Sequence, residues 1–233
     1  MTTLRQVFSD IAGAIRAKGV SGTFKPIDMA SKIGEIQSGG SEPTNLKAAF
    51  TYDTEASIIV PKTMVVDMLA MTDLTYCFFR CESATTFEFP AGFGKNAVRL
   101  GGCFASCISL TTLILPDGFG QNAQSLNINR MGCFQNCPKL TTVHLPTGFG
   151  QNSTTNGNIF YGCRALTTIT GNPNFKTSLI ISINTLTHDS LMVVINGLQT
   201  VTSKQTLTLG STNLAKLTDE EKKIATDKGW TLA

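Results

Sequence analysis

The chain of 233 residues carries 19 basic and 16 acidic residues, a net charge of +3, and only 15% of its residues are charged while 42% are hydrophobic. This composition excludes a disordered chain, and the absence of a basic stripe argues against nucleic acid as a partner. No apolar run approaches the roughly 20 residues that span a bilayer, so membrane insertion is not expected.

Residues 1–36 predict a small helical module. One face of its first helix is apolar, at intervals of three and four residues: Leu4, Val7, Phe8, Ile11 and Ile15. Gly19 ends this helix, and a shorter one follows from Pro26. Because so small a pair has too little core to be stable alone, we expect its apolar face to be buried by attachment or by homo-oligomerisation, for instance in a trimer.

Residues 37–44 are rich in Gly, Ser and Pro and predict a flexible linker. Before it, the segments 11–18 (IAGAIRAK) and 25–33 (KPIDMASKI) resemble a module found ahead of variable domains in phage tail and fibre-like proteins. The resemblance implies attachment to other virion proteins. Residues 45–233 are then expected to form one repeat domain with its own caps.

A Cys-Phe-x-x-Cys block recurs at 77–81, 103–107 and 133–137, at offsets of 26 and 30 residues, and 159–163 is a fourth copy that begins with Ile159. All seven cysteines belong to these blocks. Because they follow the repeat, we interpret Cys81, Cys107, Cys137 and Cys163 as a buried ladder of small hydrophobic side chains. Convergence of sulfurs from neighbouring repeats on a metal, or a disulfide within one pair, are the alternatives.

Each block leads into a strand-like segment, of which 110–116 (LTTLILP) is typical. Period-two alternation sends Leu113 and Leu115 inward and Thr112 and Ile114 outward, so each repeat contributes one short parallel strand. A Gly-Phe-Gly-x-Asn turn follows at 92–96, 118–122 and 148–152, with Phe expected beneath it. These turns do not open helices in the manner of phosphate-binding loops.

The pattern F-x-x-C-x-x-L-x-x-I-x-L-P at 104–116 and 134–146 resembles the BspA-type leucine-rich repeat, over about residues 60–175. It implies an α/β repeat fold, a leucine-rich-repeat solenoid with short parallel strands. A C-terminal α/β cap is predicted to close the stack, with strands near 179–183 and 207–210, helices from Thr187 and over 218–228, and residues 230–232 covering the end.

The open strand face is the candidate binding surface, since repeat proteins bind partners on such faces. Its candidate residues alternate along four strands: Thr86, Glu88, Thr112, Ile114, Thr142, His144, Thr168 and Thr170. A merely solvated face is the alternative. The only histidines, His144 and His188, have no acid and nucleophile at a catalytic spacing, so no enzyme, cofactor or metal site is expected.

The resemblance is to repeats of bacterial surface proteins and phage structural proteins. Because no export signal follows Met1, we first expect a non-enzymatic virion protein, a head or tail fibre or decoration assembled in the bacterial cytoplasm, which binds a host-surface protein or glycan. The alternative is a bacterial cell-surface adhesion protein. A weaker alternative is a glycan hydrolase that uses His144 or Glu88.

Overall fold

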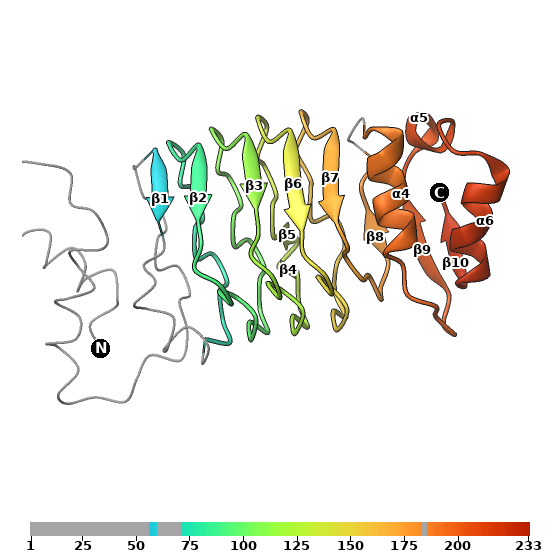
Figure 1. Cartoon of the computed structure of the whole chain (residues 1–233), viewed down its shortest axis with the longest axis horizontal. Coiled ribbons are helices and arrows are strands. Elements are labelled where there is room, and N and C mark those ends of the chain that lie inside the picture. Colours follow the sequence, from blue (N-terminus) through green and yellow to red (C-terminus); the bar gives the residue numbers. More distant parts are fainter. Residues whose placement is uncertain (1–55, 60–70, 183–185) are drawn as a thin grey trace, which may run out of the picture.

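The structure of the chain, a computed structural model, describes residues 56–59, 71–182 and 186–233 (Figure 1). The predicted helical module of residues 1–36, with its apolar face, and the linker at 37–44 lie outside the described residues. The repeats and the predicted C-terminal cap lie almost wholly within them.

The strands of the repeats stand side by side and point the same way (Figure 1): β1 (Ser57–Ile59), β2 (Thr86–Glu88), β3 (Thr112–Ile114), β6 (Thr142–Leu145) and β7 (Thr168–Gly171). β1 pairs with β2, and β3, β6 and β7 form a second parallel ladder in which Thr112, Thr142 and Thr168 are in register. Elsewhere in the coils, a row of parallel bridges joins Asp73, Arg99, Ser125 and Thr155. The predicted solenoid with short parallel strands is therefore confirmed for the repeats.

Two columns of buried phenylalanines fill the stack. The first comes from the Cys-Phe-x-x-Cys blocks and the second from the Gly-Phe-Gly turns and their continuation: Phe78, Phe104, Phe134 and Phe160, and Phe93, Phe119, Phe149 and Phe175. Within the first column successive ring centroids lie 5.1, 6.0 and 5.1 Å apart. Offset stacking at this separation adds to the free energy of burying the rings.

The last glycine of each turn is required by this column. Gly94 and Gly120 adopt φ values of 70° and 71°, and a Cβ on either would collide with the phenylalanine ring of the next repeat. Glycine therefore provides both the left-handed backbone and the space for the ring.

The second cysteine of each block makes a hydrogen bond as well as filling space. Its thiol donates to the carbonyl of the block phenylalanine one repeat earlier: Cys107 to Phe78 at 3.2 Å, Cys137 to Phe104 at 3.1 Å and Cys163 to Phe134 at 2.9 Å. All seven cysteines are buried, which confirms the predicted ladder. Burial, together with a hydrogen bond to Cys133, raises the pKa of the Cys103 thiol well above its usual range.

One repeat contains a β-hairpin that the sequence analysis did not predict. Its strands, β4 (Asn127–Ile128) and β5 (Met131–Gly132), are antiparallel, and the two turn residues Asn129 and Arg130 have φ values of 49° and 67°. Positive φ at both central residues is typical of the tight hairpin turn whose twist matches that of its strands. The hairpin accounts for the longer offset of this repeat.

The C-terminal cap is a parallel sheet of β8 (Leu179–Ile180), β9 (Gln205–Thr208) and β10 (Trp230–Leu232), with α4 (His188–Asn196), α5 (Ser211–Leu214) and α6 (Asp219–Asp227). The predicted helices are confirmed, and Thr218 and Glu221 form the capping box of α6. Two details were wrong. The strand expected at 207–210 begins at Gln205, and residues 230–232 form a third strand instead of a plain cover.

Helix α4 covers the end of the repeat sheet, next to β7 (Figure 1). The buried Ser190 hydroxyl accepts a hydrogen bond from Ile169 N at 2.9 Å and donates to Thr167 O at 3.1 Å, and Thr187 N donates to the same carbonyl at 2.9 Å. These groups supply the hydrogen-bond partners that the backbone of a further strand would otherwise supply. The edge of β7 is thus closed to another sheet.

Candidate binding face

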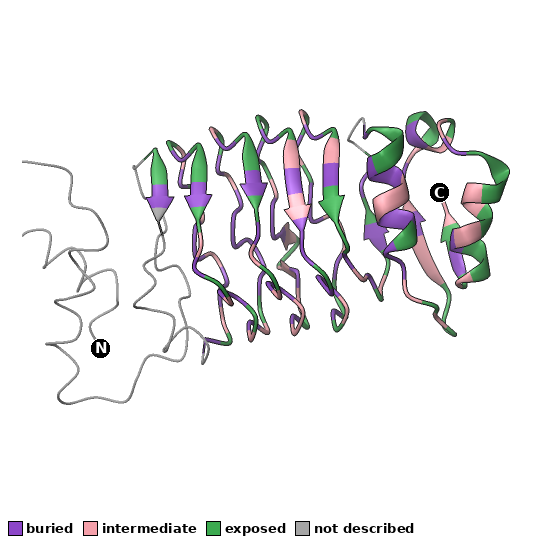
Figure 2. Ribbon diagram, in the orientation of Figure 1, coloured by how far each residue is buried: buried purple, intermediate pink, exposed green. Residues whose placement is uncertain are grey.

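The outward side chains of the repeat strands form the candidate binding face. In β2 and β3 the middle residue is buried and the flanking residues are exposed, as Figure 2 shows. Thr86 and Thr112 are exposed, while Thr142 and Thr168 are half-buried. The alternation follows from strand geometry, which places every second side chain on the same side of the sheet.

The threonines that precede β2 and β6 have a structural function. Thr85 Oγ1 donates to Ala56 O at 2.9 Å, and Thr141 Oγ1 donates to Thr111 O at 3.0 Å. Each hydroxyl thereby pairs a carbonyl of the preceding repeat, which stabilises the stacking of coils. Thr85 and Thr141 thus help to hold the coils together, and they do not by themselves indicate a ligand.

A different outward column changes in every repeat. We call it the variable column: Glu88, Ile114, His144 and Thr170. Ile114, His144 and Thr170 are in register across β3, β6 and β7. Ile114 is 64% exposed, and His144 Nδ1 lies 3.0 Å from Thr170 Oγ1. An exposed carboxylate, an exposed apolar side chain and an imidazole–hydroxyl pair thus follow one another along the face.

The column gives little support to hydrolysis. Glu88 and His144 belong to β2 and β6, and β3 with Ile114 lies between these strands (Figure 1). A glycosidase of the usual kind needs two carboxyl groups flanking one bond, and Glu88 is the only acidic side chain of the variable column. Among the described residues, no group of three or more His, Cys, Asp and Glu side chains is arranged to hold a metal ion.

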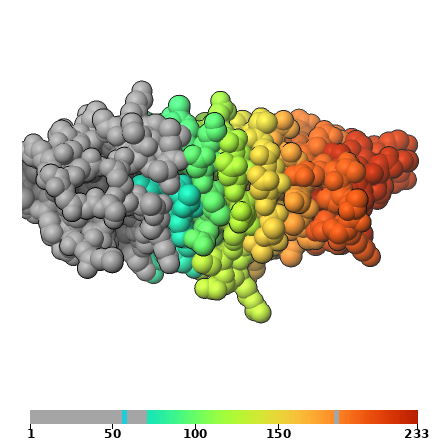
Figure 3. Space-filling model, turned by 90° about the horizontal axis from the view of Figure 1, so that it is seen from below, coloured from blue at the N-terminus to red at the C-terminus, as the bar shows by residue number. Residues whose placement is uncertain are grey.

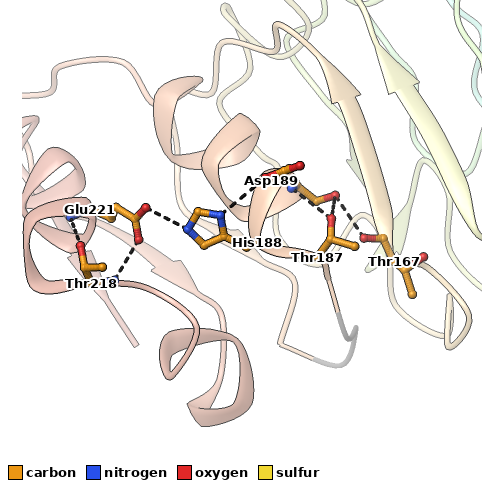
Figure 4. A network of polar contacts seen from close by, with 7 residues as sticks. Thr167, Thr187, His188, Asp189, Thr218 and Glu221 are labelled. Atoms are coloured by element: carbon orange, nitrogen blue, oxygen red, sulfur yellow. Dashed lines mark hydrogen bonds and ion pairs between the residues drawn. The ribbon is translucent and has the colours of Figure 1, made fainter.

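The second histidine joins two helices of the cap. Figure 4 shows His188 at the start of α4 reaching Glu221 of α6, with 2.8 Å between Nε2 and Oε1. The other carboxylate oxygen of Glu221 accepts from Thr218 N at 2.9 Å. The hydrogen bond to Glu221 raises the pKa of His188. His188 therefore links α4 to α6 and is not part of the repeat strands.

The fold and its face define a leucine-rich-repeat domain, a class that generally serves binding and is typically non-catalytic. Residues 74–179 match the model of the BspA type leucine rich repeat region, in six copies. A search of the curated proteins and of the solved structures finds no match for the chain. The resemblance stated for the repeats is thus confirmed within residues 74–179.

The other functional predictions gain nothing from these matches. The likeness of residues 11–33 to phage proteins lies outside both the matched segment and the described residues, as does the apolar face proposed for oligomerisation. The virion assignment and the oligomeric state stay predictions. In the described parts of the chain, no helix has both the length and the apolar character to cross a membrane.

Proposed function

We propose that the protein is a BspA-like interaction protein of a bacterial cell surface, which acts by binding a host-surface protein or glycan through the variable column. Ile114 is the observation that carries this proposal. It is 64% exposed at the centre of the face, between the strand that bears Glu88 and the strand that bears His144. Burial of this exposed apolar side chain by a partner would contribute binding free energy at the centre of the face.

The shape and chemistry of the face support an extended partner. The face is a row of parallel strands (Figure 1), and its outward groups combine hydroxyls, one carboxylate and one apolar side chain. Thr86, Thr112, Thr142 and Thr168 flank the variable column and can donate or accept hydrogen bonds. Such a surface fits a protein segment or a glycan chain that crosses several repeats.

A binding assay with two isoleucine variants tests the proposal. The labelled chain is applied to a glycan array and to immobilised fibronectin, as wild type, Ile114→Arg and Ile108→Arg. Ile108 is the matched control because it is also exposed, at 43%, but lies in the turn after Cys107 instead of on a strand. We expect Ile114→Arg to weaken binding at least about tenfold and Ile108→Arg to leave it unchanged.

Two outcomes count against the proposal. Equal binding by wild type and Ile114→Arg removes the strand face from recognition. No binding to any glycan or to the matrix protein removes the proposed class of partner. Both variants place a charge at an exposed position, so their unfolding midpoints should stay close to that of wild type.

A further inference from the structure

Thr112 and Thr142 differ from the threonines that hold the coils together. Thr141 Oγ1 donates to Thr111 O at 3.0 Å, whereas the hydroxyls of Thr112 and Thr142 form no hydrogen bond with any other described residue. Both side chains lie on the outer side of their strands, Thr112 exposed and Thr142 half-buried. Each hydroxyl can donate one hydrogen bond and accept others. These two strands therefore offer polar groups that the fold itself does not use.

Two outward positions of β3, β6 and β7 repeat at a constant interval. They lie in register across the ladder: Thr112, Thr142 and Thr168, and Ile114, His144 and Thr170. Neighbouring strands lie about 4.8 Å apart. A partner that crosses the strands consequently meets equivalent positions at this interval, three times in succession.

The β4–β5 hairpin does not interrupt this interval. It lengthens one repeat, yet the strands on either side of it, β3 and β6, pair directly with each other. Figure 1 draws the hairpin behind the row of strands, and Figure 3 shows a protrusion whose yellow-green colour corresponds to its part of the sequence. The strand face therefore stays free of this projection.

A polypeptide matches the interval poorly. Side chains on one side of an extended chain recur about every 6.6 Å, since each residue advances about 3.3 Å. Such a chain loses register with the strands within three repeats. A peptide could instead join the sheet as a further strand, but at β7 the edge is already paired by Ser190 and Thr187. The ladder thus disfavours a peptide partner.

A chain of β-1,4-linked pyranose units matches the interval better, because each unit of this extended ribbon has nearly the length of the strand spacing. Its rims carry hydroxyl groups, and its ring faces are largely C–H. The outward side chains of the ladder are hydroxyls, one imidazole and Ile114, with no carboxylate, ammonium or guanidinium group. Ile114, 64% exposed, can pack on a ring face, while Thr112 and Thr142 bond to the sugar hydroxyls.

We propose that the strand face binds a neutral, linear, β-1,4-linked glycan that runs across β3, β6 and β7, with one sugar unit for each strand. The inference rests on the proposed function, because it names the partner of the same face. It also sets a length, since three strands in register define three adjoining subsites.

Calorimetric titration with two glucose trimers tests the inference. Cellotriose has extended β-1,4 linkages, whereas maltotriose has the same composition but α-1,4 linkages that curve the chain. Cellobiose measures the contribution of the third subsite. Thr112→Val removes one hydroxyl and keeps the shape of the side chain. Thr231→Val makes the same change at an exposed strand position of the cap and is the matched control.

We expect wild type and Thr231→Val to bind cellotriose equally, and to bind it at least about tenfold more tightly than maltotriose or cellobiose. Thr112→Val should weaken binding of cellotriose about threefold to tenfold, and Ile114→Arg should weaken it at least about tenfold. Equal affinity for the two trimers, unchanged affinity in Thr112→Val, or no binding of cellotriose would each overturn the inference.

The assay with fibronectin and the glycan array separates this failure from a failure of the proposed function. Binding of fibronectin that Ile114→Arg weakens, without binding of cellotriose, would keep the strand face as the binding surface and reject the glycan. Binding that Ile114→Arg leaves unchanged for every partner would reject both.

Discussion

Cysteine recurs in these repeats because it satisfies two demands of one buried position. The site needs a small apolar side chain, and the phenylalanine carbonyl of the preceding repeat needs a donor. Cys137 meets both, with its Sγ 3.1 Å from Phe104 O in a fully buried environment. Alanine would lack the donor, and leucine would exceed the space in a close-packed core.

Replacement of Cys137 by alanine should therefore destabilise the protein by about 1–3 kcal/mol, because the Phe104 carbonyl loses its side-chain donor in a buried site. The matched control is Cys133→Ala, which removes the same volume at an equally buried position; its thiol bonds to the Cys103 thiol, so this variant leaves no buried carbonyl without its thiol donor. Urea unfolding measures both. Equal losses of stability in the two variants would show that side-chain volume alone explains why cysteine recurs at this position.

At the scale of elements, the contact between α4 and α6 has a defined pH dependence. The hydrogen bond to Glu221 raises the pKa of His188 above 6.5, and hydrogen bonding from Thr218, followed by the contact with His188, lowers the pKa of Glu221 below 4.5. The contribution of His188 to the free energy of unfolding is complete below the pKa of its unfolded state and is lost as pH rises through the pKa of its folded state. The contribution of Glu221 to the free energy of unfolding is present above the pKa of its unfolded state and is lost as pH falls through the pKa of its folded state.

The pair thus stabilises the cap most between about pH 4.5 and 6.5. We expect His188→Gln to lower the melting temperature in this window and to have little effect at pH 9, where the wild-type imidazole is neutral. Thermal unfolding of both proteins from pH 4 to pH 9 measures the difference. The Thr218 cap of α6 is intact in the variant, so a difference that does not change with pH would contradict the assignment.

The features of these elements that can be predicted from the sequence are those that neighbouring residues determine. Leu113 lies inward and Ile114 outward because alternation along a strand is a property of the strand itself. The capping box of α6 is equally local, since Thr218 and Glu221 are three residues apart. The contact of Ser190 with β7 depends on residues that only folding brings together. The 30-residue offset was the one visible sign of the hairpin, and it did not reveal which groups the hairpin would border.

At the scale of the whole molecule, a solenoid has two ends, and each must be closed. Every repeat offers one strand edge to the next, so the last strand would leave unpaired N–H and C=O groups. Here the hydroxyl of Ser190 and the backbone of Thr187 pair the edge of β7, and buried residues of α4, Leu191, Val194 and Ile195, contribute to the core. The cap therefore limits the stack as well as stabilising it.

A chain that ends at residue 186 should associate beyond the oligomeric state of the full chain, because Thr167 O and Ile169 N lose their partners and the end of the core is uncovered. Light scattering at matched concentrations measures this. A matched variant adds Thr170→Lys to the shortened chain, which places a charge at an exposed position of β7 and should reduce the association. A shortened chain that keeps its circular dichroism spectrum and scatters like the full chain would show that α4 is not needed to close the edge, and that the repeats already end the sheet without it.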